Sequence, residues 1–166
     1  MIRLLVAAVA ALALAQAPKA ADKPAPAPSL AIKALDGSTV RLASSKGRIV
    51  LVDFWATWCA PCKVSFPALD ALATSLKDRG VDVLAVSVDE DRKDLDEFIS
   101  AQPIKTMRIL LDPEMKAADA FKVGALPTSF IVDRQGRIRF THAGYGPDAV
   151  ERFAAEIRTL LDESPQ

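Results

Sequence analysis

Short apolar runs separated by turn residues dominate the chain after residue 30. Residues 48–54, Arg-Ile-Val-Leu-Val-Asp-Phe, form a near-continuous apolar run in which Asp53 is the anomaly. Such a run is typical of a central strand that is covered on both faces. Residues 81–88 form a second strong strand pattern, rich in valine. The two segments therefore predict buried strands.

Helical spacing appears between these two strands. Apolar side chains recur three or four positions apart in residues 66–76, which predicts a helix starting at or just after Cys59. Pro61 suits its first turn, where the missing N–H costs nothing. Pro67 is expected to kink the helix, and Arg79-Gly80 is a stop signal.

The remaining elements are expected from turn residues and spacing. Asp36-Gly37 lies between two short apolar runs and predicts a β-hairpin over residues 30–42. In chain order, we then expect a helix after 89–92 that ends before Pro103, a strand at 109–111, a helix from Asp112-Pro113 to about 121, strands at 129–132 and 137–141, and a helix from 146–148 to 161. This order predicts a three-layer α/β sandwich with some antiparallel strands.

Residues 1–15 are typical of a secretory signal peptide. Arg3 supplies a minimal basic region, only Leu, Val and Ala follow it, and the segment ends in an A-x-A cleavage sequence. The apolar run is short for a bilayer span, and an uncleaved anchor is the alternative reading. Residues 16–29, rich in Ala, Pro and Lys, are expected to be a flexible linker. The folded domain is expected over 30–162, with 163–166 as a tail.

Composition narrows the function. The 166 residues include 21 basic and 21 acidic side chains without a Lys/Arg cluster, which argues against nucleic-acid binding. Export would place the protein in an oxidising compartment, the periplasm or a similar extracytoplasmic space. Its two cysteines are too few for a disulfide scaffold.

Both cysteines lie in one C-x-x-C motif, which indicates redox chemistry. A structural disulfide would stabilise more by closing a longer loop. At a helix start, free N–H groups and the helix dipole stabilise a thiolate. We therefore expect Cys59 to be the attacking nucleophile and Cys62 the resolving thiol. A zinc site needs two more ligands, and only His142 remains as a candidate, so neither a metal nor another cofactor is expected.

Residues 52–62, Val-Asp-Phe-Trp-Ala-Thr-Trp-Cys-Ala-Pro-Cys, resemble the active-site motif of the thioredoxin superfamily. The export signal, the leading hairpin and the helix inserted after Val86-Ser87-Val88-Asp89 resemble its TlpA/ResA branch. The resemblance covers about residues 30–162. It implies a thioredoxin fold, α/β/α with a mixed central sheet, carrying an N-terminal β-hairpin and an inserted helical segment.

The resemblance also implies a substrate groove beside the dithiol. Pro127 would be a cis-proline there, Leu126 and Gly144 would line a groove that pairs with the partner's backbone, and Trp55 and Trp58 would pack around the active-site helix. The candidate substrate-binding residues are Trp58, Pro61, Leu126, Pro127, Thr128 and Gly144.

Asp53 is expected to be a buried carboxylate whose pKa is raised by desolvation. The resemblance implies that it assists deprotonation of Cys62, while the simpler reading is an Asp that ends the strand and caps a turn. A lysine that accompanies this carboxylate in thioredoxins would fall near Ala85 here. Without that cation, the pKa of Asp53 is expected to rise further.

Two other polar positions bear on the function. Many cytochrome-maturation members of the branch carry Glu three residues after the second cysteine, where this chain has Ser65. An apocytochrome c substrate is therefore not assigned. His142 is read either as a proton donor or, with more weight, as an ordinary residue at a strand end.

These observations predict an exported, monomeric thiol–disulfide oxidoreductase that reduces disulfides of exported proteins and is recharged by a membrane electron donor of the DsbD type. The alternatives are a disulfide oxidant or isomerase of the same fold, a partner-binding module in which the dithiol is idle, and a thiol peroxidase. The sequence alone leaves the direction of electron flow open.

Overall fold

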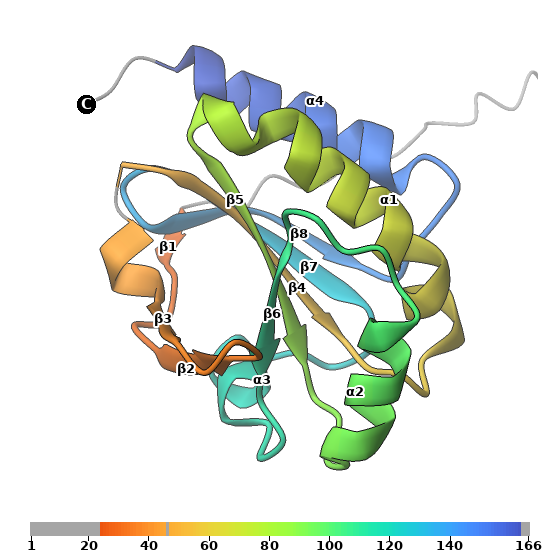
Figure 1. The fold of residues 1–166 in the computed structure, drawn as a ribbon. Helices are drawn as coiled ribbons and strands as arrows, with labels where there is room; N and C mark the ends of the chain where they lie inside the picture. Colours follow the sequence, from red (N-terminus) through yellow and green to blue (C-terminus); the bar gives the residue numbers. More distant parts are fainter. Residues whose placement is uncertain (1–23, 46, 164–166) are drawn as a thin grey trace, which may run out of the picture.

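Eight strands form one sheet in the order β1-β8-β7-β4-β5-β6-β2-β3 (Figure 1). The computed structural model describes residues 24–45 and 47–163, so the predicted signal peptide, the start of the linker and the last three residues lie outside the description. The strands are β1 (Ala25–Pro26), β2 (Ala31–Ala34), β3 (Thr39–Arg41), β4 (Ile49–Trp55), β5 (Val81–Ser87), β6 (Arg108–Leu111), β7 (Thr128–Val132) and β8 (Arg137–Ala143). The helices are α1 (Ala60–Leu76), α2 (Arg92–Ser100), α3 (Lys116–Ala120) and α4 (Ala149–Asp162), with 3-10 turns η1 (Leu42–Ser45) and η2 (Lys77–Arg79).

Strand β4 lies at the centre of the sheet, as its apolar run predicts. It pairs in parallel with β5 and antiparallel with β7, and all seven of its residues are buried. Strands β5 and β6 are also parallel, whereas β2 joins β6 in the antiparallel direction. The predicted mixture of parallel and antiparallel strands is therefore confirmed.

Two aromatic side chains at the end of β4 pack against helical segments on opposite faces of the sheet. Successive residues of a strand point to opposite faces. The Phe54 ring packs against Phe121, which follows α3, with centroids 5.3 Å apart. The Trp55 ring contacts Phe66 of α1 at 4.4 Å and Phe98 of α2 at 5.3 Å. Helices α1 and α4 run side by side over the sheet, completing three layers (Figure 1).

Helix α1 begins directly after Cys59, as predicted. It continues as one helix through Pro67, where the sequence predicts an interruption with a kink, and it passes into the 3-10 turn η2. Gly80 then adopts the left-handed conformation, with φ of 78°, and leads into β5. The predicted stop at residues 79–80 is thus confirmed.

The start of α3 differs from the prediction. Asp112 and Pro113 were expected to be the N-cap and first helical residue, but the helix begins at Lys116 after Met115, whose φ is 54°. The carboxylate of Asp112 instead accepts hydrogen bonds from the amides of Ala117 (3.0 Å) and Ala118 (2.9 Å). Asp112 still caps the helix, but it does so across an additional turn of chain.

The end of the predicted linker belongs to the sheet. Ala25 and Pro26 pair with Ile138 and Arg137 of β8, and the Ala27 amide donates to the Gly136 carbonyl at 2.8 Å. Strand pairing therefore begins about five residues before residue 30, where the sequence places the start of the domain. An extended, proline-containing segment is compatible with an outer strand, where the missing N–H of proline removes no shared bond.

Candidate active site around Cys59 and Cys62

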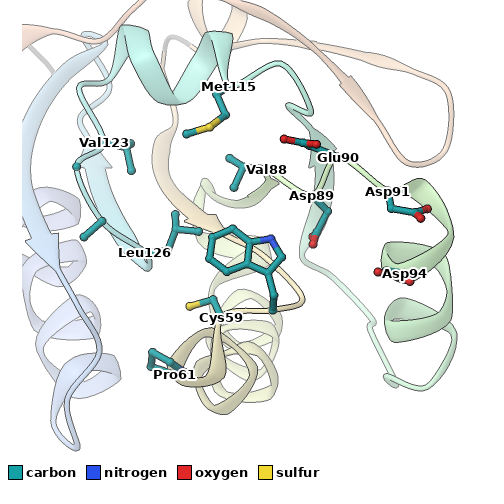
Figure 2. Close-up of a pocket in the computed structure, with 13 residues that line it drawn as sticks. Cys59, Pro61, Val88, Asp89, Glu90, Asp91, Asp94, Met115, Val123 and Leu126 are labelled. Carbon is teal, nitrogen blue, oxygen red and sulfur yellow. The ribbon is translucent and has the colours of Figure 1, made fainter.

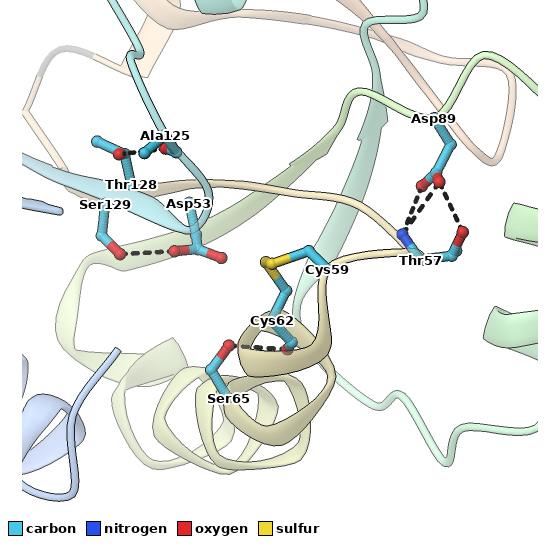
Figure 3. Close-up of a disulfide and its surroundings, with 9 residues drawn as sticks. All are labelled: Asp53, Thr57, Cys59, Cys62, Ser65, Asp89, Ala125, Thr128 and Ser129. Carbon is cyan, nitrogen blue, oxygen red and sulfur yellow. Dashed lines mark hydrogen bonds between the residues drawn. A yellow bond between two sulfur atoms is a disulfide. The ribbon is translucent and has the colours of Figure 1, made fainter. Parts of the chain in front are cut away.

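Cys59 and Cys62 form a disulfide bond at the start of α1 (Figure 3). Cys59 is the N-cap residue and Cys62 lies in the first turn, with Cα atoms 5.2 Å apart. Pro61 is among the first helical residues, where it displaces no hydrogen bond. Cys59 is 6% exposed, whereas Cys62 is fully buried. A partner sulfur can therefore approach Cys59, and Cys62 lies behind it.

The helix start provides the electrostatic setting that the sequence predicts. The N-terminal turn of α1 contains no acidic residue, and the Cys59 side chain occupies the cap position without a side-chain capping bond. The free amides of a first helical turn carry partial positive charge. After reduction, a thiolate on Cys59 would face these amides.

Asp89 holds the turn that carries Cys59. Its carboxylate, at the end of β5, accepts bonds from the Thr57 amide (3.0 Å) and the Thr57 hydroxyl (2.6 Å). The Ser87 hydroxyl donates to the other carboxylate oxygen at 2.7 Å. These groups are buried, so an unpaired partner would be costly. The network couples the segment after β5 to Thr57, two residues before Cys59 (Figure 3).

Asp53 is buried in the middle of the sheet on the dithiol side. It is 2% exposed, and burial raises its pKa to about 7 even though a hydrogen bond from Ser129 opposes the shift. Its Oδ2 atom has no hydrogen-bond partner among the described residues. Figure 3 shows that this oxygen faces the disulfide, whereas the other oxygen of Asp53 faces Ser129. The expected raised pKa is confirmed, and the reading of Asp53 as a turn cap is wrong.

The neighbours of Asp53 on the two adjacent strands differ in character. Ala85 of β5, an uncharged residue, is its register partner on one side. Ser129 of β7 is its partner on the other side, and the Ser129 hydroxyl donates to Asp53 Oδ1 at 2.5 Å. Among the residues that the structure describes, the carboxylate is therefore held by one hydroxyl and no cation.

The loop before β7 contains the predicted cis peptide, between Leu126 and Pro127. Pro127 and Thr128 are buried, and the Thr128 hydroxyl donates to the Ala125 carbonyl at 2.7 Å. The Gly144 amide donates to the Pro127 carbonyl at 2.8 Å. The Gly144 N–H is therefore used within the chain, where it anchors the cis-proline loop.

A cavity of about 760 Å³ opens beside Cys59 (Figure 2). Three predicted substrate-binding residues line it, namely Trp58, Pro61 and Leu126. Pro127, Thr128 and Gly144 are not part of its wall. The full lining is Trp58, Cys59, Pro61, Val88, Asp89, Glu90, Asp91, Asp94, Met115, Val123, Gly124, Ala125 and Leu126.

The two tryptophans have different surroundings. Trp55 is fully buried and contacts Phe66 of α1, as the resemblance implies. Trp58 is 69% exposed and contributes to the cavity wall. Only Trp55 therefore packs into the core beside the helix, while Trp58 is available to a partner.

Ser65 and His142 have local structural partners. The Ser65 hydroxyl is buried and donates to the Cys62 carbonyl at 2.9 Å, within α1. His142 Nε2 lies 2.7 Å from a carboxylate oxygen of Glu156 in α4, and its ring packs against Phe153. His142 does not line the cavity. These contacts favour the simpler reading of His142.

Three residues of the site were missed in the sequence. The sequence predicts only a polar helix start around Asp89 and only the beginning of a strand at Ser129, and it does not single out Met115. Alternation along β7 could have placed Ser129 on one face, but only the β4/β7 register brings it to Asp53. No local signal identified Met115.

The residues that the structure describes contain neither a metal-binding cluster nor a membrane-spanning helix. Over 24–45 and 47–163, no group of three His, Cys, Asp or Glu side chains is arranged to hold a metal ion. In the same ranges, no helix has the length and apolarity required to cross a bilayer.

The sequence matches the model of the AhpC/TSA family over residues 24–141. It is 34% identical over 133 residues to thiol-disulfide oxidoreductase ResA of Geobacillus kaustophilus, covering 80% of this chain and 76% of that protein. It is 32% identical over 112 residues to ResA of Bacillus cereus, covering 68% of this chain. The matched region spans 64% of the Bacillus cereus protein.

Solved structures share the fold. A Chlorobium tepidum protein assigned as a thiol:disulfide interchange protein DsbE superposes with a TM-score of 0.79 at 33% identity, over 84% of this chain and 98% of that one. The exposed lipoprotein thioredoxin Etrx1 of Streptococcus pneumoniae superposes with a TM-score of 0.71 at 27% identity, over 79% and 98%. The predicted thioredoxin fold is confirmed by these superpositions.

Proposed function

The chain belongs to the AhpC/TSA family of the thioredoxin superfamily, and we propose that it is an extracytoplasmic thiol–disulfide oxidoreductase that reduces protein disulfides. One observation carries the proposal: Cys59 lines an open cavity while its disulfide partner Cys62 is fully buried behind it. This arrangement gives the two sulfurs the different roles that exchange chemistry requires. The similarity to ResA and DsbE proteins supports the same activity.

The first step uses the reduced form of the site. The Cys59 thiolate, stabilised by the N-terminal turn of α1, attacks one sulfur of the partner's disulfide. The partner's S–S bond breaks as a new S–S bond to Cys59 forms. The partner's second sulfur leaves as a thiolate and takes a proton from solvent.

The second step releases the partner. Cys62 gives its proton to Asp53, whose pKa of about 7 lets it accept one near neutral pH. The Cys62 sulfur then attacks Cys59, and the partner's first sulfur leaves and is protonated. The partner has gained two electrons and two protons, and the protein is left with the Cys59–Cys62 disulfide described here.

A reductase in an oxidising compartment must be reduced again. We infer that a membrane electron donor of the DsbD type supplies the electrons through its own dithiol. The apolar residues 4–15 support export, by a cleaved signal peptide or as an anchor. One structural relative is described as an exposed lipoprotein, which supports the same location.

The decisive experiment is disulfide trapping in the native host. Cys62→Ser should accumulate mixed disulfides on Cys59, because the resolving sulfur is missing, and mass spectrometry would identify the partners. Cys59→Ser should trap none and should abolish insulin reduction. If Cys59→Ser retained activity, the dithiol would be idle and the binding-module alternative would replace this proposal.

The reduction potential distinguishes reductase from oxidant. A value below about −200 mV supports reduction of partners, whereas a value near about −120 mV would make the protein an oxidant.

The peroxidase alternative is tested by the rate of reaction with peroxide. Hydrogen peroxide should oxidise the reduced protein no faster than a small dithiol of similar acidity.

A further inference from the structure

Large apolar side chains are exposed in the cavity beside Cys59. The described residues include three exposed large apolar side chains, and two of them, Trp58 (69%) and Met115 (44%), line this cavity. Figure 2 shows Val88, Met115 and Leu126 grouped on one side of the space. Their arrangement next to a reactive sulfur suits an apolar side chain of a partner.

The other side of the cavity is acidic. Asp89, Glu90, Asp91 and Asp94 contribute to the wall, and its lining contains no Lys, Arg or His. Figure 2 shows the last three at the margin near the start of α2. The chain as a whole has equal numbers of acidic and basic residues, so this excess of negative charge is local.

The cations of α2 form their ion pairs away from this margin. On α2, Arg92 pairs with Asp96 at 2.7 Å, and Lys93 lies 3.7 Å from Glu97. No ion pair involves Glu90, Asp91 or Asp94 within the described ranges. Asp91 accepts the Lys93 amide as the helix cap, which leaves its negative charge in place.

We propose that this cavity selects partner proteins whose disulfide is flanked by a large apolar residue and by lysine or arginine. The occupant is an extended segment of the partner, with its cysteine at Cys59, its apolar side chain among Trp58 and Met115, and its cation at the acidic margin. Such complementarity raises the rate of encounter and disfavours acidic partners. This inference rests on the proposed reductase function and specifies its substrates.

Matched peptides test the selectivity. Three peptides share one intramolecular disulfide and a flanking Leu, and carry two Lys, two Glu or two Gln beside it. Their rates of reduction by the fully reduced protein are divided by their rates with dithiothreitol, which removes the effect of Lys on the peptide thiols. We expect the Lys peptide to react about tenfold faster than the Glu peptide at low salt, and within about twofold of it in about 0.5 M sodium chloride.

Two double variants locate the effect. Asp91→Asn with Asp94→Asn removes two charges from the margin while Asn preserves the helix cap, and it should abolish the preference. Asp78→Asn with Asp162→Asn changes the net charge equally at exposed positions outside the cavity wall, leaves the ion pairs of α2 intact, and should retain it. Replacing the flanking Leu by Ala in the Lys peptide should slow its reduction severalfold.

The outcomes separate this inference from the proposed function. Equal normalised rates for the Lys and Glu peptides, or a preference that survives Asp91→Asn with Asp94→Asn, would overturn the selectivity while the protein remained a reductase. If the reduced protein reacted with every peptide no faster than Cys59→Ser, the proposed function itself would fail.

Discussion

Asp53 and Ser129 face each other across β4 and β7, and the Ser129 hydroxyl donates a 2.5 Å hydrogen bond to Asp53 Oδ1. Both residues are 2% exposed. The bond stabilises the charged carboxylate and thereby limits the rise in pKa that burial produces. Ser129 is therefore placed to tune the proton acceptor proposed for Cys62.

Ser129→Ala should raise the pKa of Asp53 above its value of about 7, because desolvation would remain and the opposing hydrogen bond would be lost. Carbon-13 NMR titration of the Asp53 carboxyl in the oxidised protein measures this directly. The pH profile of insulin reduction should shift to higher pH in the same variant. Ser129→Thr, which retains the hydroxyl, should restore both values.

A distant serine controls for nonspecific effects. The Ser75 hydroxyl donates to the Leu72 carbonyl within α1, far along the helix from the dithiol. Ser75→Ala should leave the pKa of Asp53 unchanged. An unchanged pKa in Ser129→Ala as well would show that the hydroxyl does not tune the carboxyl.

Asp53→Asn should stabilise the oxidised protein at high pH and not at low pH. The folded pKa of about 7 lies above the ordinary carboxyl pKa of 3.8, so between these values the folded state holds a proton that the unfolded state releases. The free energy of unfolding of the wild type therefore falls as pH rises from about 4 to about 7, by up to roughly 4 kcal/mol. Asn removes this dependence.

Urea unfolding at about pH 4 and about pH 8 measures the effect. The gain in Asp53→Asn should appear at the higher pH, and insulin reduction should be slower because Cys62 loses its proton acceptor. An equal gain at both pH values would instead indicate improved packing rather than removal of a buried charge.

Asp89→Ala should lower both stability and activity. The substitution leaves the buried Thr57 amide without its acceptor and frees the turn before Cys59. We expect a loss of about 2–4 kcal/mol in the free energy of unfolding and a lower rate of insulin reduction. Asp78→Ala, at an exposed acidic residue in η2, is the control and should stay within about 0.5 kcal/mol of the wild type. Wild-type activity in folded Asp89→Ala would refute the positioning role.

Asp70→Ala should lower stability and leave the chemistry intact. Its carboxylate, in α1, accepts bonds from the amides of Lys105 (3.0 Å), Thr106 (3.0 Å) and Met107 (2.8 Å), and none of these residues lines the cavity. Urea unfolding should show a loss of about 3 kcal/mol. Insulin reduction at about 25 °C, where most of the variant stays folded, should match the wild type. A large loss of activity in the folded variant would place this loop in partner binding.

The sequence predicted those features whose cause is local. Continuous apolar runs identified β4 and β5, and spacing after Cys59 identified α1, because burial imposes these patterns on neighbouring residues. The position of Asp53 within such a run marked it as exceptional. The cis bond at Pro127 came from family resemblance, since an isolated Leu-Pro pair carries no signal for it.

Features that depend on distant segments were not predicted. Ser129 reaches Asp53 only through the β4/β7 register, and Asp89 reaches Thr57 only because β5 ends beside the turn after β4. The late start of α3 has a different cause: Asp112 caps amides five and six residues ahead, beyond the two- or three-residue spacing of an ordinary N-cap. The strand at residues 25–26 was not predicted, because the Ala- and Pro-rich composition of this segment is also typical of a flexible linker.

The short strand β1 bears on the behaviour of the protein at high concentration. Without Ala25 and Pro26, strand β8 would present unpaired backbone groups along its outer side, and such an open strand invites a second molecule to add to the sheet. Pro26 has no N–H with which to continue the pairing outward. A chain shortened to begin at Ser29 would thus lose little of its core, yet it would gain a surface for self-association.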